Sequence, residues 1–174
     1  MSADRSPKTG ATARLRVRTA GDGDIEAVCA CLAAAFEPYR ATYTRGAFLD
    51  TVPDRDGIAR RLREMTVLVA EATTADAATR FAGTIAYQVS ESGVGHLRGM
   101  AVPPDFQGRG VAERLLEEAE AGLLAQGCTR VTLDTTRPLE RAIRFYERLG
   151  YRPTGMVTDF HGMPLYEYAK AIGG

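Results

Sequence analysis

Two glycines at positions 108 and 110 stand directly before a segment of helical periodicity that begins near Val111. Glycine leaves neighbouring backbone N–H groups free to point into one space, and the start of a helix adds roughly half a positive charge there. Together these groups form a site for a phosphate or pyrophosphate without the help of a lysine. The alternative is the tight turn of an ordinary strand-to-helix connection, which binds nothing.

The residues around the two glycines narrow the class of phosphate compound. No Gly-Lys-Ser or Gly-Lys-Thr follows them, which disfavours the P-loop of nucleotide-binding proteins. The dinucleotide pattern Gly-x-Gly-x-x-Gly is also incomplete, because the residue three positions after Gly110 is Glu113. A nucleotide-binding α/β domain is therefore kept only as a third hypothesis, behind a site for another phosphate-bearing ligand.

Tyr146 is the second residue of interest. It lies in the segment 142–151, on one face of an expected helix together with Ile143 and Leu149. A tyrosine on such an apolar face is commonly a core residue whose hydroxyl has found one partner. What distinguishes Tyr146 is its place in the chain, since it follows the glycine loop after one expected helix and one expected strand.

Hydrophobic periodicity predicts the elements that must position these residues. Strands are expected over residues 15–18, 66–70, 81–89, 94–102, 130–134, 151–157 and 163–169. Helices are expected over about 25–36, 54–64 (with a basic outer face), 111–123 and 138–149, whereas 39–51 has no regular pattern and 73–79 predicts an exposed hairpin loop. This order predicts one mixed sheet covered by helices on both faces, an α/β or mixed α+β fold.

Composition places the chain among ordinary globular proteins. Lys plus Arg and Asp plus Glu are balanced at 22 each, which gives no electrostatic indication of nucleic acid or membrane as a partner. The three cysteines, Cys29, Cys31 and Cys128, have spacings that suit neither a zinc site nor a redox CxxC motif, and we expect buried thiols in a reducing cytoplasm. Residues 1–13 predict a disordered tail, and 14–174 predict a single domain.

The two motifs taken together resemble those of a known family. Gln107-x-x-Gly110-x-Ala112 matches the Gln/Arg-x-x-Gly-x-Gly/Ala acyl-CoA loop of the GNAT N-acetyltransferase superfamily. The segment 145–151, Phe-Tyr-Glu-Arg-Leu-Gly-Tyr, is similar to the Tyr-Glu-Lys-x-Gly-Phe segment that follows the loop in that family. The resemblance is specific from about 94 to 151, and element order extends it over about 15 to 169.

The resemblance implies a GNAT-like central sheet, mixed and mostly antiparallel, of about seven strands with helices on both faces. It implies acetyl-CoA as a cosubstrate, no metal, and an N-acetyltransferase domain over 14–174. The pantetheine arm would lie along Met100, Ala101 and Val102, pairing with their backbone groups as an added strand does. The remaining cofactor-binding residues implied by the resemblance are Gln107, Gly108, Arg109, Gly110, Val111 and Ala112, with Arg109 or Arg114 as candidates to reach a CoA phosphate.

The chemistry implied is direct transfer of an acetyl group to a primary amine of a small molecule or peptide. A free amine has a pKa of about 10, so a proton must be removed from it at neutral pH. A backbone N–H near Met100 is the expected oxyanion donor, Tyr146 is the expected general acid, and no cysteine needs a role. The general base is open among Glu71, Glu91, His96, Asp159, His161 and a water chain.

One departure from the family pattern concerns the start of the tyrosine helix. Many members have an asparagine there that contacts CoA, whereas this sequence has Leu139, and Arg137 or Arg141 could replace the contact. The departure gives some support to the alternative of a non-catalytic acyl-CoA-binding or sensing domain. A homodimer is a further possibility that no sequence feature decides.

The acceptor site is the part of the chain about which the sequence is least informative. Candidates for its wall are Tyr39, Tyr43, Arg45 and Phe48, which could equally form an ordinary connection between two helices. An arginine in this wall would favour an acceptor with a carboxylate or a phosphate.

Overall fold

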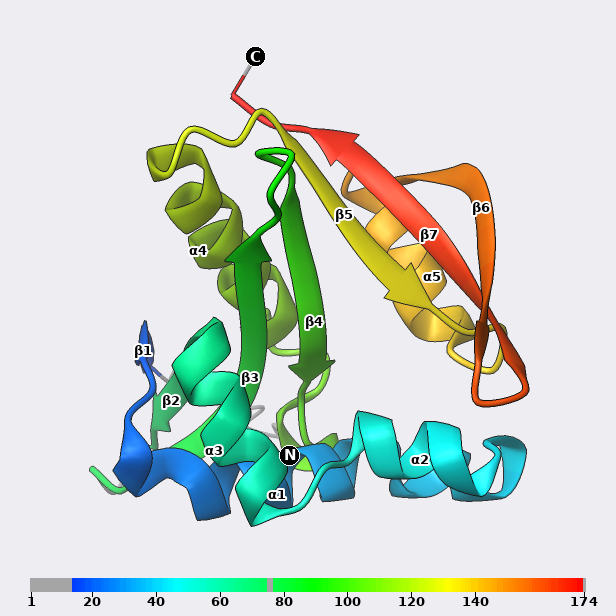
Figure 1. The fold of residues 1–174 in the computed structure, drawn as a ribbon. Coiled ribbons are helices and arrows are strands. Elements are labelled where there is room, and N and C mark those ends of the chain that lie inside the picture. Colours follow the sequence, from blue (N-terminus) through cyan, green and yellow to red (C-terminus); the bar gives the residue numbers. More distant parts are fainter. Residues whose placement is uncertain (1–13, 75–76, 174) are drawn as a thin grey trace, which may run out of the picture.

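The computed structural model describes residues 14–74 and 77–173 of the chain. Within these ranges one seven-stranded sheet forms the centre of the molecule, and helices cover both of its faces (Figure 1). The predicted mixed, mostly antiparallel sheet of about seven strands is confirmed. The expected tail at 1–13 lies outside the described residues. No helix in the described part combines the length and apolarity needed to cross a membrane.

The strands follow the order β1-β2-β3-β4-β5-β7-β6 across the sheet. Neighbours are antiparallel except β4 and β5, which run parallel at the centre. The inner strands β2 to β5 come from apolar runs whose side chains pack in the two cores between the sheet and its helices, whereas the edge strand β6 is largely exposed. The strands are β1 (Arg14–Thr19), β2 (Thr66–Thr73), β3 (Thr79–Val89), β4 (Gly95–Ala101), β5 (Arg130–Thr135), β6 (Arg152–Phe160) and β7 (Met163–Ala171).

The parallel strands β4 and β5 separate soon after they meet. In β4 only the stretch from Gly95 to Leu97 pairs with β5. Beyond Leu97 the two strands diverge (Figure 1), so the edge of β4 from Arg98 to Ala101 has no neighbouring strand in the described part of the chain. The backbone N–H and C=O groups of this edge are left without ladder partners, which makes the split a place where a ligand can bind as an added strand.

A bulge in β4 lies at the same place, on the edge that faces β3. Thr84 pairs with Ala101, but Ala86 already pairs with Arg98, so β4 contains one extra residue here. Gly99 lies in the bulge with φ of +63°, a conformation that L side chains rarely adopt. The bulge changes the direction of the β4 backbone beside the split.

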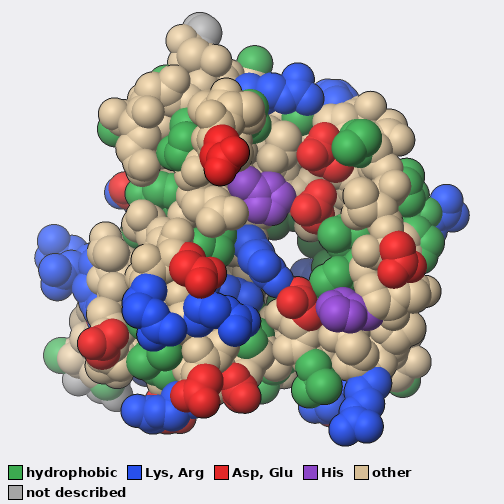
Figure 2. Space-filling view, in the orientation of Figure 1, with side chains coloured by type: hydrophobic (Ala, Val, Ile, Leu, Met, Phe, Trp, Pro, Cys, Tyr) green, Lys and Arg blue, Asp and Glu red, His purple; other side chains and the backbone are tan. Residues whose placement is uncertain are grey.

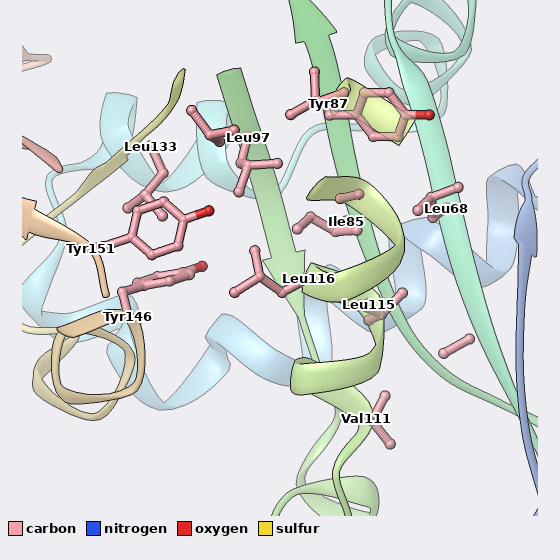
Figure 3. Close-up of a cluster of buried hydrophobic side chains, with 14 of the residues drawn as sticks. Leu68, Ile85, Tyr87, Leu97, Val111, Leu115, Leu116, Leu133, Tyr146 and Tyr151 are labelled. Carbon is pink, nitrogen blue, oxygen red and sulfur yellow. The ribbon is translucent and has the colours of Figure 1, made fainter. Parts of the chain in front are cut away.

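The helices divide between the two faces of the sheet. α4 and α5 pack on one face around a large apolar core, and α1 and α3 pack on the other around a smaller one. Leu115 and Leu116 of α4 belong to the same buried cluster as the sheet residue Ile85, and in Figure 3 the rings of Tyr146 and Tyr151 lie next to each other. The helices are α1 (Ile25–Phe36), α2 (Arg45–Thr51), α3 (Arg55–Glu64), α4 (Val111–Ala125) and α5 (Glu140–Arg148), with short 3-10 turns at Asp22–Asp24, Glu37–Thr42 and Pro104–Phe106.

Three expectations about the helices need correction. The stretch 39–51 is helical over most of its length, because Thr44 accepts a hydrogen bond from the Ala47 amide at 3.2 Å and so caps α2. The basic face of α3 is not wholly outward, since Arg61 is buried. α5 begins at Glu140, two residues after the expected Pro138.

Candidate active site

A cavity of about 910 Å³ opens where β4 and β5 separate. Its lining comes from the end of β4, the loop before α4, the first turn of α4, the end of β5, α5, and the region from α1 to α3. Figure 2 shows a hollow near the centre of this face, with basic, acidic and histidine side chains around it. The cavity therefore brings together segments that lie far apart in the sequence.

The glycine loop presents free backbone N–H groups to the cavity. Gly108 and Gly110 have φ of +71° and +77°, and both line the cavity. Gly110 is the N-cap of α4, no side chain caps the helix, and Arg114 N donates to the Gly110 carbonyl at 3.1 Å. Among the described residues, the N–H groups from Gly108 to Glu113 have no hydrogen-bond acceptor. This is the geometry of an anion site at a helix amino terminus.

Gln107 fastens the loop to the end of β4. Its Nε2 donates to the Val102 carbonyl at 3.0 Å, and its Oε1 accepts from Arg141 at 3.2 Å. The preceding residue, Phe106, is buried in the large core and anchors the start of the loop. Both residues precede the glycine pair, so they hold the loop at its amino-terminal side.

The arginines around the loop differ in where they point. Arg109 and Arg114 do not line the cavity: Arg109 lies over an aromatic ring, and Arg114 pairs with a glutamate one turn along α4. Arg137 also lies outside the lining and donates to a tyrosine hydroxyl at 2.7 Å. Arg141 does line the cavity, where it contacts Gln107. Of the four arginines considered from sequence, Arg141 is therefore the one at the cavity.

Polar groups without ladder partners line the split on both strands. Met100, Ala101 and Val102 line the cavity at the free edge of β4. Across the split, Thr135 is 3% exposed, and its Oγ1 is the one buried side-chain polar atom without a partner in the described ranges 14–74 and 77–173. A buried hydroxyl without a partner costs about 1–3 kcal/mol, which a ligand with amide groups would offset. The residues present thus fit the pantetheine arm of acetyl-CoA.

Tyr146 reaches the cavity from the core side of α5. Its side chain is 8% exposed, and its ring centre lies 5.7 Å from that of Tyr151 (Figure 3). The Tyr151 hydroxyl donates to Glu120 at 2.7 Å, whereas the Tyr146 hydroxyl has no hydrogen-bond partner within the described chain. Burial raises the pKa of Tyr146, so its phenol holds its proton far above neutral pH.

His96 and Asp134 meet on the other face of the sheet, where β4 and β5 begin to separate. The Nε2 of His96 lies 3.6 Å from an Asp134 oxygen, and its Nδ1 lies 3.0 Å from the Thr132 hydroxyl. Burial lowers the pKa of His96, and Asp134 partly opposes this. Burial also raises the pKa of Asp134. Arg98 and Glu167 are the other charged groups that act on the pair.

The five side chains considered as a general base do not come together. His96 lines the cavity, whereas the other four do not. Glu71 pairs with Arg18 at 2.7 Å, and Asp159 accepts from the Gly162 amide at 3.2 Å in the last hairpin. The two remaining candidates, Glu91 and His161, are exposed in turns.

Half of the expected acceptor wall lies at the cavity. Tyr39 and Tyr43 line it, and the Tyr43 hydroxyl is 2.7 Å from that of Thr136. Arg45 is exposed and Phe48 is buried, and neither reaches the lining. Of the four residues expected in this wall, two aromatic residues lie at the cavity, and the arginine does not.

Sequence reasoning missed several charged residues of the lining, among them Asp134 and Arg61. Asp134 ends an expected strand and follows the buried Leu133. Because side chains alternate between the two faces of a sheet, the sequence could have indicated that Asp134 and Leu133 face opposite sides of the sheet. Arg61 gave no such signal, because Arg60 and Arg63 on the same helix are exposed. Packing of α3 against α1 and β2 decides which arginine is buried.

Comparison with known proteins agrees with this geometry. The sequence of residues 30–151 matches the acetyltransferase (GNAT) family. An acetyltransferase of Pectobacterium atrosepticum is 36% identical over 59 residues, which cover 34% of this chain and 42% of that protein. The chain thus aligns with less than half the length of this relative.

Solved structures share the whole fold at low sequence identity. The PaiA N-acetyltransferase of Thermoplasma acidophilum, in complex with coenzyme A, has a TM-score of 0.72 and 16% identity, covering 91% of this chain and 99% of that one. The ribosomal-protein-S18-alanine N-acetyltransferase of Escherichia coli has a TM-score of 0.68 and 18% identity, covering 92% and 96%. The fold and the sequence match agree, and the chain belongs to the acetyltransferase (GNAT) family.

Proposed function

We propose that this protein is an acetyl-CoA-dependent N-acetyltransferase that moves an acetyl group directly from the thioester to a primary amine of a small molecule or peptide. The observation that carries this proposal is a single cavity containing an unpaired strand edge, an uncapped helix amino terminus and an unbonded phenol. Membership of the GNAT family supports the same reaction class.

The donor side of the cavity is the wall formed by residues 100–102 and 107–113. The backbone groups of Met100, Ala101 and Val102 would pair with the amides of pantetheine, as in the addition of a strand. The N–H groups from Gly108 to Ala112 and the dipole of α4 would hold the pyrophosphate. Acetyl-CoA supplies the acyl group as an activated thioester, and these residues fix its position beside the split.

The acceptor side is the wall formed by the region from α1 to α3 together with His96 and Asp134. On this side, His96 takes the proton of the amine. The Thr132 hydroxyl donates to the Gly95 carbonyl at 3.3 Å, so it accepts from His96 at 3.0 Å. These partners assign the proton of neutral His96 to Nδ1 and leave Nε2 as the proton acceptor. Asp134, 3.6 Å from Nε2, stabilises the imidazolium that forms.

Tyr146 supplies the proton that the departing thiolate needs. The backbone N–H at Met100, next to the bulge, stabilises the negative charge that develops on the carbonyl oxygen. A thiol has a pKa of about 8.5 and a phenol about 10, so the phenol is the weaker acid in water. Burial disfavours both anions, which keeps proton transfer from Tyr146 close to balanced inside the cavity.

Transfer is direct, without an acyl-enzyme. Cys31 is buried, and burial raises the pKa of its thiol to about 12. Cys128 is fully buried, and neither these two cysteines nor Cys29 lines the cavity. A nucleophilic cysteine needs a lowered pKa and access to the substrate.

The test is release of free thiol when the protein is mixed with acetyl-CoA and a panel of primary amines. We expect thiol release that depends on the amine, an acetylated amine by mass spectrometry, and an unchanged protein mass after acetyl-CoA alone. Stabilisation by acetyl-CoA in a melting experiment without thiol release for any amine would support the acyl-CoA-sensing alternative instead. Stabilisation by NAD or ATP but not by CoA would support a nucleotide-binding domain.

A further inference from the structure

Arg61 of α3 is a buried cation at the cavity with no partner to neutralise it. Its residue is 8% exposed, it lines the cavity, and its guanidinium makes no hydrogen bond or ion pair with the described residues. A guanidinium carries five N–H donors, and none of the Arg61 nitrogens is among the fully buried unpartnered atoms of the described residues, so its free donors face the cavity. A purely structural arginine in this position would be expected to bind carbonyl groups or a carboxylate.

The neighbouring charges do not balance Arg61. The nearby Asp50 carboxylate is hydrogen-bonded to Arg98, which also lines the cavity. Burial and, to a smaller extent, the charge of Arg98 lower the pKa of Arg61 to about 10, although Asp50 partly opposes this. Cys29 raises it and Arg60 lowers it, as smaller effects. Arg61 is still protonated at neutral pH, and this group of side chains keeps one unmatched positive charge.

The bulge in β4 places the guanidinium beside the expected reaction centre. A Cβ atom added at Gly99 would lie 2.6 Å from Nη1 of Arg61, so a side chain at this position would displace the guanidinium. Gly99 immediately precedes Met100, whose N–H we expect to face the thioester oxygen. One residue of a strand spans about 3.3 Å. A group bound by Arg61 would therefore lie only a few atoms from the reacting amine.

We propose that Arg61 binds a carboxylate of the acceptor, and that the acceptor is a small aminocarboxylate whose amine and carboxylate are separated by one or two carbons. This inference rests on the proposed acetyltransferase function and narrows its acceptor. The planar fork of arginine matches a carboxylate through two parallel hydrogen bonds. One unmatched positive charge suits a monoanion better than a doubly charged phosphate.

The test pairs α- and β-amino acids with their own carboxamides as acceptors in the thiol-release assay. Wild type should use the carboxylates with kcat/KM about 10²-fold higher, because the carboxamide leaves the buried Arg61 without an anion. The amine of the carboxamide is less basic than that of the carboxylate, so a larger fraction of it is unprotonated and nucleophilic at neutral pH. This intrinsic difference favours the carboxamide and therefore opposes the expected preference.

The variant Arg61→Met should lose about 10²-fold in kcat/KM for the carboxylates and little for the carboxamides. Its KM for acetyl-CoA should not change, and its melting temperature should be equal or higher, because an unpaired buried charge has been removed. Arg60→Met, which removes an exposed charge one residue away on the same helix, is the matched control and should retain the preference.

Several outcomes would overturn the inference while leaving the acetyltransferase intact. The first is equal use of carboxylates and carboxamides, and the second is a preference for aminoalkyl phosphonates or peptide amino termini. The third is a lower melting temperature of Arg61→Met, which would mean that the guanidinium has a structural role. Absence of thiol release with every amine would instead refute the proposed function itself.

Discussion

The two sides of the cavity are built from different kinds of groups. The donor side consists mainly of backbone N–H and C=O groups, exposed by Gly108, Gly110 and the open edge of β4. The acceptor side consists of side chains, including His96 and Arg61, that separate elements bring together. Backbone sites follow from a local glycine pattern, whereas side-chain sites follow from the packing of the whole fold. The two sides should therefore respond differently to substitution.

The largest effect should come from the base on the acceptor side. His96→Gln should lower kcat about 10³-fold, because general base catalysis by a positioned side chain is of this size. The KM for acetyl-CoA should stay near its wild-type value. His161→Gln, which changes the other histidine outside the cavity, is the control and should have wild-type kinetics. A kcat unchanged in His96→Gln would leave a water chain as the base.

A donor-side variant should have the opposite signature. Gly110→Val should raise the KM for acetyl-CoA about 10²-fold, because it disturbs the N–H groups that hold the pyrophosphate. Gly93→Val is a matched control, since Gly93 has φ of +76° and open space around it but does not line the cavity. Both variants should lose about 1–2 kcal/mol of stability through backbone strain. Equal KM values in the two variants would argue against pyrophosphate binding at the loop.

Asp134→Asn should have a smaller effect that depends on pH. His96 must be neutral to accept a proton, so kcat/KM falls as pH drops through its pKa, which burial holds below the ordinary 6.5. Asp134 stabilises the charged form and raises that pKa. Its loss should shift the acid limb about one unit lower and reduce the plateau about 10-fold. An acid limb that stays in place would separate Asp134 from the base.

The smallest expected effect concerns the rim of the donor side. Arg141→Met should raise the KM for acetyl-CoA about 3-fold, because an exposed ionic contact contributes little. Arg114→Met, which lies outside the cavity, should change nothing measurable. A larger effect of Arg114 than of Arg141 would mean that the phosphates lie nearer to α4 than we propose.

The difference between backbone sites and side-chain sites also explains which parts of the molecule could be predicted from the sequence. The strands and the helices α1, α3 and α4 could be expected from apolar periodicity, and the glycine loop from local backbone chemistry. α2 was missed because its seven residues have no clear apolar stripe and depend on the Thr44 cap. Arg61 could not be separated from Arg60, since only the packing of α3 buries one of them.

The most direct test of the account compares two neighbouring tyrosines. Tyr146→Phe removes a hydroxyl without a partner among the described residues, so it should lower kcat about 10²-fold or more with no loss of stability. Tyr151→Phe removes the hydroxyl that donates to Glu120 outside the cavity, so it should lower the melting temperature and leave kcat unchanged. Thiol release and thermal melting of both variants measure this directly. Wild-type turnover in Tyr146→Phe would contradict the account.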